Sequence, residues 1–335
     1  MQLSKFMKRT VLALFIASSW VAGGASLSAR AEEKYPSKPI TILIGFSVGG
    51  SMDTAARLQG EVMSKVLGVP IVYRNVAGAG GRNSVTILNR SKPDGYTMAA
   101  INVPGQIVNM VVRGLPPDLR TFKWVGPQVA MPYFLQASKK SPWKSLKQMK
   151  QAKKPIRAAI TGTGGNTFPI TVIASDIVGY PVRFISGFKA PEIIAAIIRG
   201  DVEVTTMPLS PRWHSAVKSG DARAIAVYSP ERRPVFPEIP TGVEQGFPEL
   251  GKPALLSYNL YALPPGTPPE IVSVLESALA KASRDKKTKE KIEANGSLVK
   301  PRSGKETALL LKEQFSLVKK NSSLLNKYVK AKKKK

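Results

Sequence analysis

The sequence predicts an α/β fold made of two lobes of like topology, each with a mostly parallel sheet flanked by helices. Two observations support this prediction. Apolar strand patterns alternate with amphipathic helix patterns along the chain, which is typical of parallel βαβ units. The order of strand, glycine-rich turn and helix then returns 111 to 116 residues later.

The first 31 residues are expected to be a signal peptide and to take no part in the fold. Lys5, Lys8 and Arg9 form a basic start, residues 11–22 are apolar, and residues 29–31 form an Ala-x-Ala cleavage site. The apolar run is too short and too interrupted for a comfortable membrane span, although an uncleaved anchor is the alternative. We therefore expect the mature chain to be exported.

The mature chain opens with a strand, a turn and a helix. Residues 40–46 are nearly all apolar, as in a strand that is covered on both faces. The helix predicted over Met52–Leu67 has Asp53 in its first turn and Gly68 as its stop. A second strand is predicted over Ile71–Arg74.

The same unit continues and is then repeated. After "NVAGAGGRNS", a helix is predicted over Asn83–Asn89 and a strand over Tyr96–Ile101. The stretch "KPITILIGFSVGG" is echoed 116 residues later by "KPIRAAITGTGG", and "GVPIVYRNVAGAGG" is echoed 111 residues later by "GYPVRFISGFKAPE". The shared spacing favours two lobes of like topology over chance.

This repeat sets the expected domain boundaries. Residues 1–31 form the signal peptide, residues 32–138 with 257–335 form the first lobe, and residues 139–256 form the second lobe. The lysine-rich helices of the C-terminal segment are expected to pack back on the first lobe. That lobe is therefore predicted to be discontinuous in sequence.

The composition excludes several kinds of site. The chain has no cysteine and one histidine, His214, which excludes thiolate chemistry and multi-histidine metal sites. No cofactor and no metal is expected. The formal net charge is +28, and the segment from Lys281 onward holds 18 Lys or Arg against 5 Asp or Glu. Such a charge attracts anionic solutes or lipid headgroups, while the export signal argues against nucleic acid as a partner.

The first turn, "GFSVGGS", has the chemistry of an anion site. Gly49 and Gly50 permit positive φ and a close approach of the backbone to a ligand. The following helix points unpaired N–H groups and its positive dipole end into the same space, where a carboxylate or phosphate can bind without Lys or Arg. Ser47 and Ser51 add hydroxyl donors, whereas Asp53 is interpreted as a helix-capping acid.

Three further turns repeat this arrangement of small residues before a helix. They are "AGAGGRNS", in which Asn83 opens a helix, "TGTGGNT" in the second lobe, and the turn before Ala190-Pro191-Glu192. Ligands bind at the carboxyl ends of strands in open α/β sheets, and two facing lobes form a closable cleft. None of the turns matches a phosphate loop or a dinucleotide fingerprint. A tight turn without a ligand is the alternative at each position.

Catalysis is poorly supported, and no catalytic residue is assigned. His214 lies beside Trp213 at a predicted helix start, where a lone histidine is most often structural. No nucleophile elbow, no Ser-x-x-Lys with its partner motifs and no suitably spaced carboxylate pair is found. Two alternatives stay open, namely an exported hydrolase that uses Ser, Asp and His214, and a periplasmic sensory or membrane-surface adaptor that uses the lysine-rich tail.

At these turns the sequence resembles the TctC or Bug family, the periplasmic solute receptors of tripartite tricarboxylate transporters. The resemblance runs from Tyr35 to about Val329. "YPSKPI" is similar to that family's opening, "GFSVGGSMDTAARL" to its first ligand loop, "NVAGAGGRNS" to its second, and "ITGTGGNTFP" to the loop of its second lobe. "KPDGYTM", "GDVEV" and "LYALPPGTP" match further stretches, and the combination is specific although each motif alone is weak.

The resemblance implies a type II periplasmic-binding-protein fold with a ligand cleft between the lobes, and a binding protein rather than an enzyme. It implies a monomeric periplasmic receptor that captures a small carboxylate-bearing anion and delivers it to a membrane permease with a large and a small subunit. In the family, backbone amides and small hydroxyls of two first-lobe loops hold the carboxylate. The expected ligand-binding residues are Phe46, Ser47, Gly49, Gly50, Ser51, Gly78, Ala79, Gly80, Gly81, Asn83, Thr161, Thr163, Asn166, Thr167, Ala190 and Met207.

The sequence also departs from the family pattern. Gly45 and Val48 replace prolines of the first loop, residues 188–190 replace Tyr-Lys-Gly, and residues 206–208 stand where many relatives carry a pocket Asp. The missing acid disfavours an amino-acid ligand, whose ammonium group would need it. A dicarboxylate, an aromatic acid or another weakly polar acid is expected instead.

Overall fold

The chain forms two five-stranded sheets whose strand orders correspond to each other. A computed structural model describes residues 34–208, 211–294 and 296–331. The expected signal peptide and the last four lysines lie outside these residues. The structure divides after Ser37. Residues 34–37, the described part of the first unit, contain no helix or strand, and all elements lie from Lys38 onward.

The first sheet is built around the apolar strand predicted at the start of the mature chain. Four of the five residues of β1 are buried, and this strand pairs in parallel with β2 and β3. Strand β10 lies antiparallel between β3 and β4. In the order β2-β1-β3-β10-β4, the strands span Ile71–Asn75, Ile40–Ile44, Thr97–Val103, Ser257–Leu263 and Lys123–Met131.

The second sheet has the same topology, and its strand β6, which is second in the sheet as β1 is in the first, is the echo of β1. Strand β6 pairs in parallel with β7 and β8, and β5 lies antiparallel between β8 and β9. Each sheet is thus mixed, with a single strand that runs against the other four. The matching strand orders confirm the prediction of two lobes of like topology. In the order β7-β6-β8-β5-β9, the strands span Val182–Ser186, Ile156–Ile160, Val204–Met207, Tyr133–Ser138 and Ala222–Tyr228.

The chain changes sheets earlier than the sequence predicts. Strand β4 ends at Met131 in the first sheet, and β5 begins at Tyr133 in the second. Residues 133–138, predicted as the end of the first lobe, therefore pair in the second sheet. The reason is that β4 and β5 form one nearly continuous buried stretch, in which only Pro132 separates the two strands. The return to the first sheet begins with β10 at Ser257.

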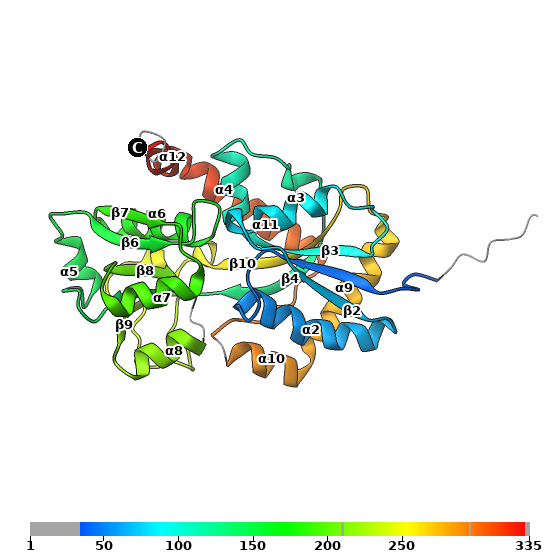
Figure 1. The fold of residues 1–335 in the computed structure, drawn as a ribbon, viewed down its shortest axis with the longest axis horizontal. Helices are drawn as coiled ribbons and strands as arrows, with labels where there is room; N and C mark the ends of the chain where they lie inside the picture. Colours follow the sequence, from blue (N-terminus) through cyan, green and yellow to red (C-terminus); the bar gives the residue numbers. More distant parts are fainter. Residues whose placement is uncertain (1–33, 209–210, 295, 332–335) are drawn as a thin grey trace, which may run out of the picture. The chain divides into compact units, whose positions relative to one another are not determined.

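Helices cover both faces of the first sheet (Figure 1). Helices α2, α9 and α10 contact one another, and α2 and α9 also contact β4. Helices α3, α4 and α11 lie on the opposite face, where α3 and α4 contact β3 and α11 contacts β4. These helices span Ser51–Leu67 (α2), Arg82–Asn89 (α3), Gly105–Val111 (α4), Pro269–Arg284 (α9), Lys286–Glu293 (α10) and Gly304–Lys320 (α11).

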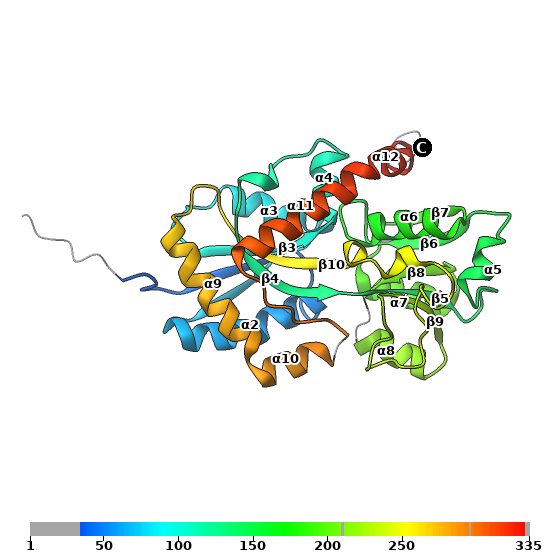
Figure 2. The same cartoon turned by 180° about the vertical axis from the view of Figure 1, so that it is seen from behind.

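The second sheet is covered in the same way, and helix α6 also contacts the first lobe. Helix α6 is apolar on nearly all sides because it packs against β8, α4, α5 and α12 at once. Figure 2 shows α12 at the end of α11, on the side of α6 and β7. The remaining helices span Leu146–Lys150 (α5), Thr167–Val178 (α6), Ala190–Arg199 (α7), Pro211–Lys218 (α8) and Ser322–Ala331 (α12), with short 3₁₀ turns at Ala79–Gly81, Leu119–Thr121, Pro248–Gly251 and Pro253–Leu255.

The C-terminal helix therefore packs on the second lobe as well as the first. Tyr328 of α12 contacts Phe184 of β7 edge to face, with ring centroids 5.3 Å apart. Phe184 contacts Phe168 of α6 in the same way at 5.5 Å. The sequence assigns the whole C-terminal segment to the first lobe, whereas these contacts also tie it to the second. Among the described helices, none combines the length and apolar character of a membrane span.

A buried network of amide side chains joins the two lobes beside the cleft. Asn166, only 5% exposed, lies in the second lobe, and its Oδ1 accepts hydrogen bonds from the first lobe's Gly105 N at 2.6 Å and Asn102 Nδ2 at 3.3 Å. Gln106 Nε2 donates to Gly80 O at 2.7 Å and lies 3.3 Å from Gly164 O of the second lobe. Because these donors and acceptors are buried, separating the lobes would break the hydrogen bonds that cross between them. The groups would then be left without a partner or exposed to water.

The substitution Asn166→Ala tests this network. It removes the acceptor of the buried Gly105 N–H, so the free energy of unfolding of the ligand-free protein should fall by about 1–3 kcal/mol. Asn83→Ala is the matched control, because the exposed Asn83 only donates to Ala77 O at 3.2 Å. Urea unfolding followed by fluorescence measures both variants. Equal losses in the two variants would contradict the assigned role of Asn166.

Candidate functional site

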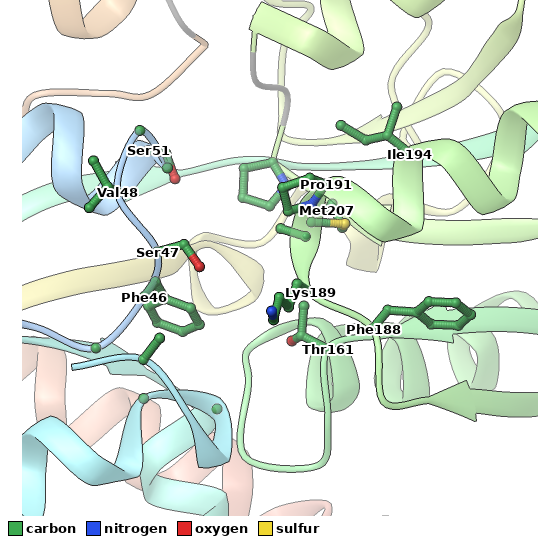
Figure 3. A pocket seen from close by; sticks show the side chains of 18 of the residues that line it. Phe46, Ser47, Val48, Ser51, Thr161, Phe188, Lys189, Pro191, Ile194 and Met207 are labelled. Atoms are coloured by element: carbon green, nitrogen blue, oxygen red, sulfur yellow. The ribbon is translucent and has the colours of Figure 1, made fainter. Parts of the chain in front are cut away.

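A cavity of about 520 Å³ lies between the loops of the two sheets (Figure 3). It opens at the carboxyl ends of β1, β2, β6 and β7, the edge at which ligands bind in open α/β sheets. Figure 3 shows Phe46, Ser47 and Ser51 facing this space from one lobe. From the first lobe it is lined by residues 45–51 and 77–81, and from the second by Thr161, residues 187–191, Ile194, Met207, Pro208, Arg212 and Trp213.

The buried carboxylate of Asp53 fixes the shape of the first loop. Its Oδ2 accepts from Gly49 N at 2.9 Å and from Arg57 Nε at 3.0 Å, and its Oδ1 accepts from Asn75 Nδ2 at 3.0 Å. The same amide group of Asn75 donates to Phe46 O at 3.0 Å. Gly49 adopts φ +76°, which an L side chain reaches only with strain. Asp53 is thus tied to the backbone of the loop before α2, rather than to the first-turn amides of the helix.

These contacts also set the charge state of Asp53. Burial alone would raise the pKa of this carboxyl group, but the hydrogen bonds from Arg57, Gly49 and Asn75 outweigh burial and hold the pKa below its usual value. The guanidinium of Arg57 compensates the negative charge of Asp53. The carboxylate therefore does not repel an anion at the start of α2 as strongly as an unpaired acid would.

The N-terminus of α2 lacks a side-chain cap and opens toward the cavity. Its N-cap residue, Gly50, has no side chain that could accept from the first-turn amides, so the N–H groups of Ser51 and Met52 have no intrahelical acceptor. The amides of Gly49 and Gly50 are already used, because they donate to Asp53 and to Ser47 O. The donors offered to a ligand are thus the first-turn amides and the hydroxyl of Ser47, rather than every glycine amide. The hydroxyl of Ser51 donates to Met131 Sδ at 3.8 Å and would have to exchange this weak acceptor for the ligand.

The second loop touches the second lobe through its glycines. Gly78, Gly80 and Gly81 all adopt positive φ, and so does Ala79 at +47°. A Cβ added at Gly80 would lie 2.5 Å from the carbonyl carbon of Gly164. Only glycine allows this backbone-to-backbone approach, which closes one side of the cavity.

The second lobe supplies a wall of different character. Met207 lies at the end of β8, and its carbonyl accepts from Gln136 Nε2 of β5 at 3.1 Å. Pro191, Ile194 and Trp213 add apolar surface. The charged side chains on this wall are those of Lys189, which precedes α7, and Arg212, in the first turn of α8.

Twelve of the sixteen expected site residues line the cavity. Asn83, Thr163, Asn166 and Thr167 do not. Asn166 joins the lobes instead, and the hydroxyl of Thr167 lies 3.3 Å from that of Thr161. The residues that line the cavity are Phe46, Ser47, Gly49, Gly50, Ser51, Gly78, Ala79, Gly80, Gly81, Thr161, Ala190 and Met207.

Sequence reasoning missed Lys189 and Arg212 as lining residues. Lys189 could have been found, because it directly precedes Ala190 at an expected helix start. Arg212 carries no signal of its own in "SPRWHS". The neighbouring His214, offered for a hydrolase, is not among the lining residues. Its ring lies edge to face against Phe236, with centroids 4.7 Å apart, as in a structural histidine.

Comparisons with known proteins find similar chains over most of the sequence. The model of the tripartite tricarboxylate transporter family receptor matches residues 55–328. Protein BugT of Bordetella pertussis is 28% identical over 300 residues, which cover 85% of this chain and 87% of that protein.

Solved structures are similar over nearly their whole length. A periplasmic transporter is 28% identical with a TM-score of 0.76, covering 88% of this chain and 97% of that one. MatC of Rhodopseudomonas palustris, solved with bound malate, is 25% identical with a TM-score of 0.73, covering 88% of this chain and all of that one.

The substitution Asp53→Asn tests the charge of the first loop. At pH 7 the free energy of unfolding should fall by about 1–3 kcal/mol, because charge-assisted hydrogen bonds are lost. The folded-state pKa of Asp53 lies below the unfolded value, so its contribution is complete above about pH 4 and is lost as pH falls through the folded-state pKa. The difference between wild type and variant should therefore shrink from pH 7 to pH 2, as measured by urea unfolding.

The control for this experiment is Glu61→Gln on the same helix. Glu61 pairs with Lys65 at 3.3 Å, and both side chains are exposed, so its removal should change stability little at either pH. A difference between wild type and Asp53→Asn that stays constant down to pH 2 would show that the charge of Asp53 contributes nothing.

Proposed function

Because the chain belongs to the receptor family of the tripartite tricarboxylate transporters, we propose that it is a periplasmic receptor that captures a small carboxylate-bearing organic anion between its lobes. Delivery of this anion to a membrane permease with a large and a small subunit is part of the proposal. So is export by the N-terminal segment, which lies outside the described residues. A monomeric state is also part of the proposal.

The observation that carries the proposal is the uncapped start of α2 at the cavity. Helix N-termini bind anions through unpaired amides and the positive end of the helix dipole. Here the dipole end faces a space that also receives the hydroxyls of Ser47 and Ser51. A carboxylate has the planar pair of acceptor oxygens that such a set of donors satisfies.

The composition of the cavity lining supports an organic acid rather than inorganic phosphate. Phe46, Ile194, Met207 and Trp213 offer apolar surface beyond the loop amides. An organic chain can bury its methylene groups there, at about 25 cal/mol for each Å² removed from water. The malate bound by the related MatC is an anion of this class.

Binding to ligand-free protein tests the proposal. The mature protein is unfolded, dialysed and refolded to remove any bound solute, and its stability is then measured against a panel of carboxylic acids. An acid present at 100 times its dissociation constant should raise the free energy of unfolding by roughly 2.7 kcal/mol. No response to any acid of a broad panel would contradict the proposal.

Variants of the first loop locate the site. Ser47→Ala with Ser51→Ala should weaken binding by about 10-fold or more, because each hydroxyl lost to an anion costs roughly 1.5–3 kcal/mol. Ser91→Ala at the end of α3 is the matched control, because its hydroxyl only donates to Ile87 O. Isothermal titration calorimetry with the tightest acid of the panel measures all three proteins. Unchanged affinity in the double variant would place the ligand elsewhere.

A further inference from the structure

The two charged side chains that line the cavity are both cationic and both come from the second lobe. They belong to Lys189, just before α7, and Arg212, at the start of α8. No Asp or Glu is among the described residues that line the cavity. The first-lobe wall, in contrast, carries only backbone groups and uncharged side chains. The two walls therefore offer an anion different kinds of donor.

Neither cation is neutralised by an ion pair within the described part of the chain. The six ion pairs found there involve other arginines and lysines. Glu192 is the acid nearest in sequence to Lys189, but its carboxylate accepts from the backbone N–H of Lys189 at 2.8 Å. Glu192 is exposed and does not line the cavity. Lys189 and Arg212 are both exposed, so within the described residues their charges meet water rather than an acid.

The positions of these groups match a ligand with two anionic ends. One carboxylate is satisfied by the amides and hydroxyls at the start of α2, as proposed above. Figure 3 shows Lys189 projecting from the second lobe toward the space that Phe46 and Ser47 face. Apolar side chains such as Met207 and Ile194 lie on the same second-lobe wall. The cavity thus offers uncharged donors on the first-lobe wall, and cations together with apolar side chains on the second-lobe wall.

We infer that Arg212 and Lys189 determine specificity by binding a second anionic group, so that the receptor selects dianionic acids over monoanionic acids of the same length. This inference rests on the proposed function. It names the residues that would restrict the ligand from any carboxylic acid to a dianionic one. The planar guanidinium of Arg212 can bind a carboxylate through two parallel hydrogen bonds, and the ammonium of Lys189 adds a point charge. With no carboxylate on the walls, a ligand's own ammonium group has no acidic partner, so amino diacids are disfavoured.

Paired acids test this inference on the ligand-free mature protein. Isothermal titration calorimetry at fixed ionic strength compares glutarate with pentanoate, succinate with butyrate, and glutarate with glutamate. Wild type should bind each dicarboxylate about 10- to 100-fold more tightly than its monocarboxylate, the range expected for one charge-assisted contact. Glutarate should also bind more tightly than glutamate.

Variants assign this preference to the side chains. Arg212→Gln should weaken glutarate binding by about 10-fold or more and change pentanoate binding by less than 3-fold. Lys189→Gln should act in the same direction. Arg212→Lys should keep only part of the preference, because it keeps the charge but loses the paired hydrogen bonds of the guanidinium. Lys218→Gln is the control. It removes the same charge from the last turn of α8, away from the cavity lining, and should leave both affinities unchanged.

The outcomes separate this inference from the proposed function. If monocarboxylates bind as tightly as dicarboxylates, or if Arg212→Gln weakens both equally, the specificity role is wrong while the receptor function stands. If Lys218→Gln lowers glutarate binding as much as Arg212→Gln does, only the overall charge matters and the role of Arg212 is wrong. If no carboxylic acid binds to wild type, the receptor function itself is wrong.

Discussion

The hydrogen bond from Gly105 N to the Oδ1 atom of Asn166 holds together the two halves of the cleft. It joins the start of α4 in the first lobe to the start of α6 in the second. Beside it, the glycines of two loops approach until their backbones touch. The cavity exists because these loops are held face to face, so each ligand contact proposed here depends on this junction. Rigid loops that are already in place reduce the entropy that an anion must overcome on binding.

Much of the fold could be predicted from local patterns. The apolar run of β1 and the Gly68 stop of α2 were readable because each depends on residues close in sequence. The repeat of the first unit predicted the equivalent topology of the second sheet. The passage of the chain from β4 to β5 could not be predicted, because both strands are buried and a single residue, Pro132, separates their patterns. Only the pairing partners, which lie far away in sequence, distinguish them.

The candidate site likewise has features that follow from local sequence and features that depend on distant residues. Glycine-rich turns before helices predicted the loops that line the cavity. A glycine indicates a positive φ or a close backbone approach at its own position, whatever the rest of the fold. The role of Asn166 in joining the lobes could not be predicted from the sequence, because its partners Asn102 and Gly105 lie more than 60 residues away. Arg212 was missed for a related reason. A single arginine is ordinary in so basic a chain, and only the fold brings it to the cavity wall.

Electrostatics act at two ranges in this molecule. The net charge of +28 produces a positive field that attracts anions from solution, an effect that salt screens within about 10 Å at 0.1 M ionic strength. Inside the cavity, the proposed selection would depend on short-range donors whose effect salt reduces far less. In this proposal the first-lobe wall would bind the anion through dipoles and the second would offer full charges, so capture and discrimination would fall to different lobes.

Amide chemical shifts offer the most direct test of anion capture between the lobes. The chain has 27 glycines, so protein labelled with ¹⁵N-glycine gives a small set of signals, several of them from the two first-lobe loops. Addition of a bound carboxylic acid should shift the signals of Gly50, Gly78 and Gly80, and should leave the helix-end glycines Gly68 and Gly179 in place. Shifts confined to glycines outside the cavity lining would show that the acid binds elsewhere, and capture between the lobes would then be wrong.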